Sequence, residues 1–175
     1  MNHKSDYSAY IGLDVHKETI AVAIADSGRI GEVRFWGNIV NRPVNIRNLF
    51  NKLLKNHADL LVCYEAGCCG FGVYRLLTSV EIDCVVIAPS RRVKSPTDRI
   101  KNDHRDAVAL ARLLRAGELV SVWVPDEVHE AMRDLIRARF ASKRDMQVAR
   151  QRVQSLLLRA NRIYDKKSWT VRHRI

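Results

Sequence analysis

The sequence has 175 residues, 47% of them hydrophobic, which suits one ordinary domain with an appendage and a buried core. Its 30 Lys and Arg against 19 Asp and Glu give a net charge of +11, which favours a polyanionic partner, although a basic surface can also be merely solvated. A polar start, no apolar run near the ~20 residues of a membrane span, and cysteines without zinc-site spacing predict a cytoplasmic protein and no membrane partner.

Three strand-like runs open the chain. Tyr10–Val15 is followed after a short link by Thr19–Ala25, and Asp26-Ser27-Gly28 is a turn signal that leads into a third run at 29–36. Connections this short join antiparallel neighbours, because parallel strands need a crossover of about a dozen residues or more. The opening third of the sequence therefore predicts an antiparallel meander.

The pattern changes after a break at Asn41-Arg42-Pro43. Apolar residues from Val44 to Leu54 recur at helical spacing. A buried strand, a short helix and a second buried strand then follow at Leu60–Glu65, Tyr74–Val80 and Cys84–Ala88. The order β-β-β-α-β-α-β, with helical crossovers before the last two strands, predicts an α/β fold with a mixed sheet.

A basic, irregular segment at 90–102 precedes a helix predicted from about Asp103 to Ala116, with Gly117 as its stop. Basic side chains at this point could hold a nucleic-acid backbone, and the plain alternative is an exposed loop. We single out six of them: Arg91, Arg92, Lys94, Arg99, Lys101 and Arg105. Lys17, in the turn after the first strand, could also touch a phosphate or simply be a polar turn residue.

From Asp126 to about Asp165 the chain predicts one long helix after a brief extended stretch at 120–124. Two interleaved series with a seven-residue stagger are typical of a coiled-coil seam: Met132, Arg139, Met146, Val153 and Ala160, and Leu135, Ser142, Ala149, Leu156 and Ile163. Residues 127–175 hold 13 basic and 5 acidic side chains, so +8 of the net charge lies here. We expect two domains, 1–125 and 126–175, with the second as a basic arm and a homo-oligomer contact.

Four acidic residues stand where they can meet. Asp14 and Glu65 each end an apolar strand, and ligands gather beyond the carboxyl ends of parallel strands. Asp103 and Asp106, three apart, share one helix face. Carboxylates crowded together repel unless a cation neutralises them, and oxygen ligands select Mg²⁺ or Mn²⁺. Taken singly, each acid could equally be a turn or helix-capping residue.

Three motifs in order resemble the DEDD insertion-sequence transposases of the one-ten family, which includes the pilin-gene inverting recombinases. They are Gly12–Lys17, Tyr64–Gly67 and Lys101–Ala107, and the tail at 169–174 is also similar. The resemblance covers nearly the whole chain. It implies the RuvC-type branch of the ribonuclease H-like fold and a transposase activity on DNA.

The resemblance also implies what the acids do. Asp14, Glu65, Asp103 and Asp106 match the four acidic positions of the family and would be the catalytic, magnesium-holding residues. Family members are guided by a structured RNA that pairs with DNA, and they carry a second domain with a nucleophilic serine. This sequence stops at Ile175, before any such domain, so we do not expect strand exchange from it alone.

Three hypotheses follow. The first is a Mg²⁺-dependent domain that cleaves and exchanges DNA strands in transposition. The second is a non-catalytic nucleic-acid-binding and dimerisation module from a truncated transposase. The third, a sugar-kinase-like or actin-like ATPase, shares the opening hairpin with its aspartate but requires a glycine-rich phosphate turn where His16-Lys17 stands, so it is disfavoured.

Overall fold

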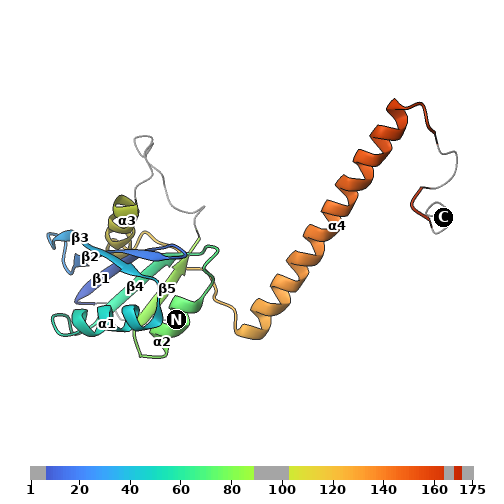
Figure 1. Cartoon of the computed structure of the whole chain (residues 1–175). Helices are drawn as coiled ribbons and strands as arrows, with labels where there is room; N and C mark the ends of the chain where they lie inside the picture. The colour runs from blue at the N-terminus through green and yellow to red at the C-terminus, as the bar shows by residue number, and fades with distance from the viewer. Residues whose placement is uncertain (1–6, 89–102, 164–167, 171–175) are drawn as a thin grey trace. The chain divides into compact units, whose positions relative to one another are not determined.

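The computed structural model describes residues 7–88, 103–163 and 168–170 (Figure 1). The chain divides into two units, Met1–Val124 and Pro125–Ile175. The first unit holds the sheet and the helices around it, and the second holds one long helix. Each unit is taken by itself below.

The first unit is built on a five-stranded sheet with the order β3-β2-β1-β4-β5. The strands are β1 (Ala9–Val15), β2 (Thr19–Asp26), β3 (Val33–Val40), β4 (Leu60–Glu65) and β5 (Asp83–Ile87). β1, β2 and β3 form an antiparallel meander, while β4 runs parallel to both β1 and β5. This strand order confirms the predicted α/β class and its mixed sheet.

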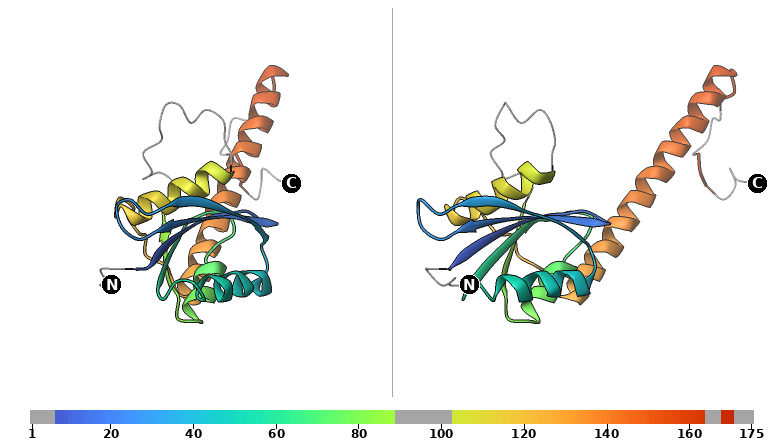
Figure 2. Two further views of the ribbon diagram at one scale, coloured as in Figure 1. Left: turned by 90° about the vertical axis from the view of Figure 1, so that its left-hand side faces the viewer. Right: turned by 60° about the vertical axis from the view of Figure 1, so that its left-hand side comes forward.

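Helices cover both faces of the sheet (Figures 1 and 2). The helices α1 (Pro43–Leu53) and α2 (Gly72–Thr78) lie on one face, and α3 (Asp103–Arg115) lies on the other. Because side chains alternate along a strand, β4 contributes residues to the cores on both faces of the sheet. Val62 and Tyr64 join the core under α1 and α2, whereas Leu61 and Cys63 pack with Leu110 of α3.

Small residues line the sheet where α3 crosses it. Alanines of β2 and of α3 form one buried cluster: Ala21, Ala23, Ala25, Ala107 and Ala111. Gly12 of β1 lies under the same helix, and a Cβ added to it would stand 2.5 Å from the backbone nitrogen of Ala111. A glycine in a strand often marks such a close backbone approach. The backbone of α3 therefore packs directly against the backbone of β1.

The third strand differs from its prediction. We expected it at 29–36, but β3 covers Val33–Val40, and the residues before it form a turn. Gly28 has a φ of 82°, and the backbone N–H of Gly31 donates to its carbonyl, so the chain turns there instead of extending. At the other end β3 continues to Val40 because that residue pairs with Thr19. The turn is longer than Asp26-Ser27-Gly28 suggested.

The stretch expected to be extended at 120–124 makes only an isolated bridge. Ser121 pairs with Ile87, and the N–H of Val122 donates to the carbonyl of Val86. Val122 and Val124 pack against the core, so this segment covers the β5 side of the first unit. All four cysteines are free thiols, and Cys63 and Cys84 are buried.

The second unit contains α4 (Glu127–Arg159). Its N-terminus is capped by Asp126, whose carboxylate accepts a hydrogen bond of 2.8 Å from the backbone N–H of His129. The helix ends at Arg159 with Ala160 as its C-cap, six residues short of the predicted end at about Asp165, and Asn161 turns the chain with a φ of 53°. No residue of α4 is buried. Within the described part of the chain, no helix is long and apolar enough to cross a membrane.

Candidate metal centre

Asp14 and Glu65 lie at the ends of neighbouring strands. β1 and β4 are parallel, and their register pairs Gly12 with Cys63 and Leu13 with Tyr64, so Asp14 and Glu65 come next side by side. Gly12 and Cys63, two residues earlier, both face α3. The two-residue period of a strand therefore turns both acids toward the α3 side of the sheet. Both are partly exposed at this edge.

The first turn of α3 brings two further acids to that side. Asp103 is its first residue, and Asp106 follows three positions later on the same helical face. An Oδ1 atom of Asp103 lies 3.4 Å from Nε2 of His16, and Oδ2 of Asp14 lies 3.1 Å from the same nitrogen. One ligand atom from each of Asp14, His16 and Asp103 falls within 4.8 Å of the other two.

The pKa of Asp14 shows the influence of Asp106, which therefore lies near it. Burial raises the pKa of the Asp14 carboxyl, and the nearby carboxylates of Asp103 and Asp106 raise it further, while His16 opposes them. Burial and like charge both penalise the ionised form of an acid. The centre therefore gathers negative charge that a cation would stabilise, and perturbed carboxyl groups of this kind are typical of functional sites.

The four predicted acids therefore come together to different degrees. Asp14 and Asp103 meet through His16, Asp106 acts on Asp14 through its charge, and Glu65 is placed next to Asp14 by strand register. We did not predict His16 as a member of the cluster. The signal was present, since His16 follows Asp14 by two residues and neighbours at that spacing point the same way in an extended chain.

The backbone of His16 is held from two directions. Its N–H donates to the carbonyl of Thr19 at 2.8 Å, which closes the turn between β1 and β2. Its carbonyl accepts a hydrogen bond of 2.7 Å from Nδ2 of Asn41, just before α1. By contrast, the ring of His104 packs edge-on against Phe35, with the ring centroids 4.3 Å apart. His16 is therefore the histidine that the fold presents to the acids.

The predicted nucleic-acid-binding residues are only partly described. Lys17 is 91% exposed and lies 3.6 Å from the carboxylate of Glu18. Arg105 is exposed on the first turn of α3, beside the acids. Five others lie outside the described residues: Arg91, Arg92, Lys94, Arg99 and Lys101. Two cationic side chains therefore stand in the same segments as the acidic cluster.

The donor set fits a divalent cation. The carboxylates of Asp14 and Asp103 and the imidazole of His16 offer ligand atoms close enough together to share an ion. Asp106 acts on Asp14 through its charge, and strand register sets Glu65 next to Asp14, but neither belongs to this group of close ligand atoms. Carboxylate oxygens suit Mg²⁺ and Mn²⁺, and imidazole nitrogen suits first-row transition ions. The partial exposure of Asp14 (20%) and Asp103 (52%) leaves the carboxylates open to solvent and to a substrate.

Comparison with known proteins points to one family. A family model described as a transposase, DEDD_Tnp_IS110, matches residues 11–161. The chain is 48% identical over 171 residues to the "Putative transposase y4qE" of Sinorhizobium fredii, covering 97% of this chain and 44% of that protein. It is 38% identical over 167 residues to the "Transposase for insertion sequence element IS1533" of Leptospira borgpetersenii, covering 94% and 48%. The chain thus spans about half the length of these curated relatives.

Among solved structures, RuvC of Thermus thermophilus aligns with 65% of this chain and 99% of its own length. The identity is 11% and the TM-score is 0.44.

Proposed function

This chain belongs to the IS110-type DEDD transposase family, and we propose that its first unit binds divalent cations and cleaves DNA strands during transposition. The observation that carries this proposal is the meeting of acids from β1 and α3 at one edge of the sheet, with Glu65 of β4 beside them. Acids brought together from three separate elements are unfavourable without a positive partner, and a cation would be that partner.

Each acid has a proposed part in holding the metal. Asp14 and Asp103 offer oxygens close enough together for a shared ion, and Asp106 and Glu65 complete the charge around it. The ion is Mg²⁺ or Mn²⁺, as oxygen-rich sites prefer. When bound, such ions supply Lewis-acid stabilisation to the attacking and leaving oxygens of a phosphoryl transfer. We propose these four acids as the catalytic residues for DNA cleavage.

The basic residues around the cluster are proposed to hold the nucleic acid. Lys17 follows the β1 acid by three residues, and Arg105 lies between the two acids of α3. Together with the basic segment before α3 they would bind phosphates and set the position of the strand, without reading its sequence. A structured guide RNA, implied by the family resemblance, is a second proposed polyanionic partner. The net charge of +11 supports both.

Complete strand exchange is proposed to need more than this chain. The curated relatives are about twice as long, and the family resemblance implies a further domain with a nucleophilic serine. We therefore expect the 175-residue chain to bind cations and nucleic acid, and to exchange strands weakly or not at all.

Calorimetry tests the cation site directly. Mg²⁺ or Mn²⁺ is titrated into the wild-type chain and into Asp14→Asn, which keeps the shape of the side chain and removes its charge. Binding is expected in the wild type, with a loss of roughly tenfold or more in affinity in the variant. Glu118→Gln, which removes an exposed carboxylate after α3, is the matched control and should bind as the wild type does. If no binding of either ion to the wild type is detected, the non-catalytic binding module is favoured instead.

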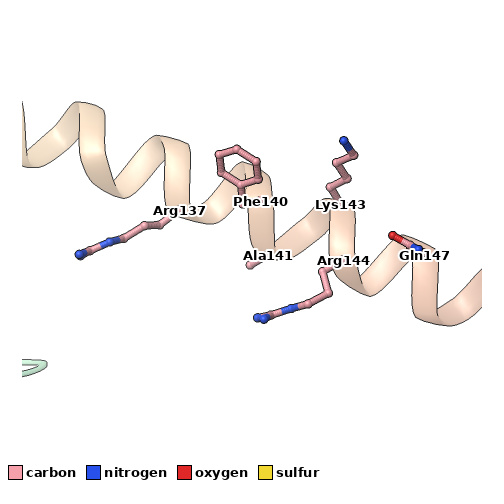
Figure 3. A pocket seen from close by; sticks show the side chains of 6 residues that line it. All are labelled: Arg137, Phe140, Ala141, Lys143, Arg144 and Gln147. Carbon is pink, nitrogen blue, oxygen red and sulfur yellow. The ribbon is translucent and has the colours of Figure 1, made fainter.

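The long helix is proposed to make a homo-oligomer. Large apolar side chains along α4 are exposed, including Met132, Leu135, Met146 and Leu156 of the seven-residue series. In the middle of the helix, Arg137 and Arg144 project to one side and Phe140 and Lys143 to another, around a hollow lined by α4 alone (Figure 3). Paired helices would cover the apolar seam and leave basic side chains outside for nucleic acid.

Light scattering over a range of concentrations tests this contact. A dimer or higher oligomer is expected, and Leu135→Asp combined with Leu156→Asp should shift it to the monomer. Glu130→Asp with Asp145→Glu, which changes two other positions on α4 and conserves their charge, is the control. A wild-type chain that stays monomeric at high concentration contradicts the proposal.

A further inference from the structure

We infer that His16 is itself a ligand of the proposed cation, and that its nitrogen makes the centre bind Mn²⁺ in preference to Mg²⁺. This inference rests on the proposed function, because it concerns the same site. It goes beyond the four acids, because it adds a fifth residue of a different chemical type and assigns it a selecting role.

The geometry around Nε2 carries the inference. That nitrogen lies 3.1 Å from Oδ2 of Asp14 and 3.4 Å from Oδ1 of Asp103. A ring nitrogen carries at most one hydrogen, so it can make a well-directed hydrogen bond to only one of two carboxylates at a time. A cation shared by all three groups would satisfy both carboxylates at once, and their ligand atoms already lie within 4.8 Å of one another.

The fold prepares His16 for this role. Its N–H is bonded to the carbonyl of Thr19, and its carbonyl accepts from the side chain of Asn41, so the backbone on either side of Cα is held. The ring is 37% exposed, which leaves a path for an ion from solvent. A ligand positioned before binding loses less freedom when the ion arrives, so its contribution to affinity is larger.

The chemistry of the ligand determines the selectivity. Mg²⁺ prefers oxygen ligands, demands near-ideal octahedral geometry and keeps several waters. Imidazole nitrogen suits first-row transition ions, whose affinity for nitrogen sites rises from Mn²⁺ onward in the series. A cluster of carboxylates alone would discriminate little between Mg²⁺ and Mn²⁺. Replacing one oxygen ligand by the nitrogen of His16 therefore shifts the preference toward Mn²⁺.

The first experiment compares the two ions by calorimetry on the 175-residue chain. In the wild type Mn²⁺ should bind more tightly than Mg²⁺. His16→Ala should weaken Mn²⁺ binding by about tenfold or more and Mg²⁺ binding by less than about threefold. A second variant, His16→Asp, offers oxygen in place of nitrogen and should bring the two affinities closer together by favouring Mg²⁺. Far-ultraviolet circular dichroism of each variant reports whether it is folded.

The second experiment detects the bond itself. Electron spin echo spectra of bound Mn²⁺ show modulation from a directly coordinated nitrogen. The modulation is expected in the wild type, is expected to disappear in His16→Ala, and should persist in His104→Phe, which keeps a ring against Phe35. This readout does not depend on DNA cleavage.

The outcomes separate this inference from the proposed function. If neither ion binds the wild type, the proposed function itself fails. If both ions bind but His16→Ala weakens them equally, strengthens them, or leaves the nitrogen modulation in place, the acids hold the ion without His16 and the inference is overturned. A selective loss of Mn²⁺ affinity together with loss of the modulation supports it.

Discussion

Gly12 of β1 and Ala111 of α3 approach each other backbone to backbone. A Cβ on Gly12 would stand 2.5 Å from the nitrogen of Ala111, and it would also meet the carbonyl oxygen of Ala107. This contact seats α3 directly on the sheet, and α3 begins with the two acids that reach toward Asp14. The glycine is therefore part of what determines the distance between the acids of the strand and those of the helix.

Gly12→Ala should destabilise the first unit and disturb the acidic cluster. Backbone atoms of α3 cannot move aside as a flexible side chain can, so the helix must shift away from β1, at a cost of about 1–3 kcal/mol. Urea unfolding measures the loss. Gly72→Ala is the matched control, because nothing lies within 4 Å of its added Cβ, and its stability should change by less than about 1 kcal/mol. Equal stability of the two variants would contradict the close contact.

Arg115 at the other end of α3 should contribute to stability through two hydrogen bonds. Its Nη1 donates to the carbonyls of Asp26, at 3.1 Å, and Gly31, at 2.6 Å, and so ties the helix end to the β2–β3 turn. Arg115→Ala should lower the free energy of unfolding by about 1.5–3 kcal/mol, the range for hydrogen bonds that involve a charged group. Arg112→Ala, at an exposed position of the same helix, should cost less than about 0.5 kcal/mol. Urea unfolding of both variants is the measurement, and a loss in Arg112→Ala as large as that in Arg115→Ala would contradict the prediction.

Asp14→Asn should have opposite effects with and without a cation. Burial, Asp103 and Asp106 raise the pKa of Asp14, so its ionised form opposes folding at neutral pH, and that opposition grows as the pH rises through the folded-state pKa. In a chelating buffer the variant should therefore be at least as stable as the wild type. With Mn²⁺ at 100 times its Kd the wild type should gain about 2.7 kcal/mol, and the variant much less. Equal gains in both proteins would count against the metal site.

The N-terminus of α4 should lose stability in acid. The backbone N–H of His129 donates to Asp126 and, with the His129 ring, lowers the pKa of that carboxyl. Because the folded-state pKa is lowered, the stabilisation is fully present above the ordinary value of 3.8 and is lost as the pH falls through the folded-state value. The protection factors of the first-turn amides, which are corrected for the slower intrinsic exchange in acid, should therefore fall below about pH 4. Asp126→Asn keeps a capping oxygen without the charge, and its exchange pattern should not show this step.

Much of the layout could be predicted from local pattern. The continuous apolar runs that end at Asp14 and Glu65 identify buried strands, because only a strand covered on both faces is apolar throughout. Short links identify the antiparallel meander, and the i, i+3 spacing places Asp103 and Asp106 on one helix face. The end of β3 and the shorter α4 escaped prediction. They depend on the partner strand at Thr19 and on the left-handed turn at Asn161, which apolar periodicity does not report.

The amino-acid order by itself determined which segments form strands and which form helices, since these follow from periods of two and 3.6 residues along the chain. Only the tertiary structure decided that His16 lies between Asp14 and Asp103. That meeting requires α3 to pack on the sheet at backbone distance, which is a contact between segments distant in sequence. Distances between such segments depend on packing, and packing involves every layer of the fold at once.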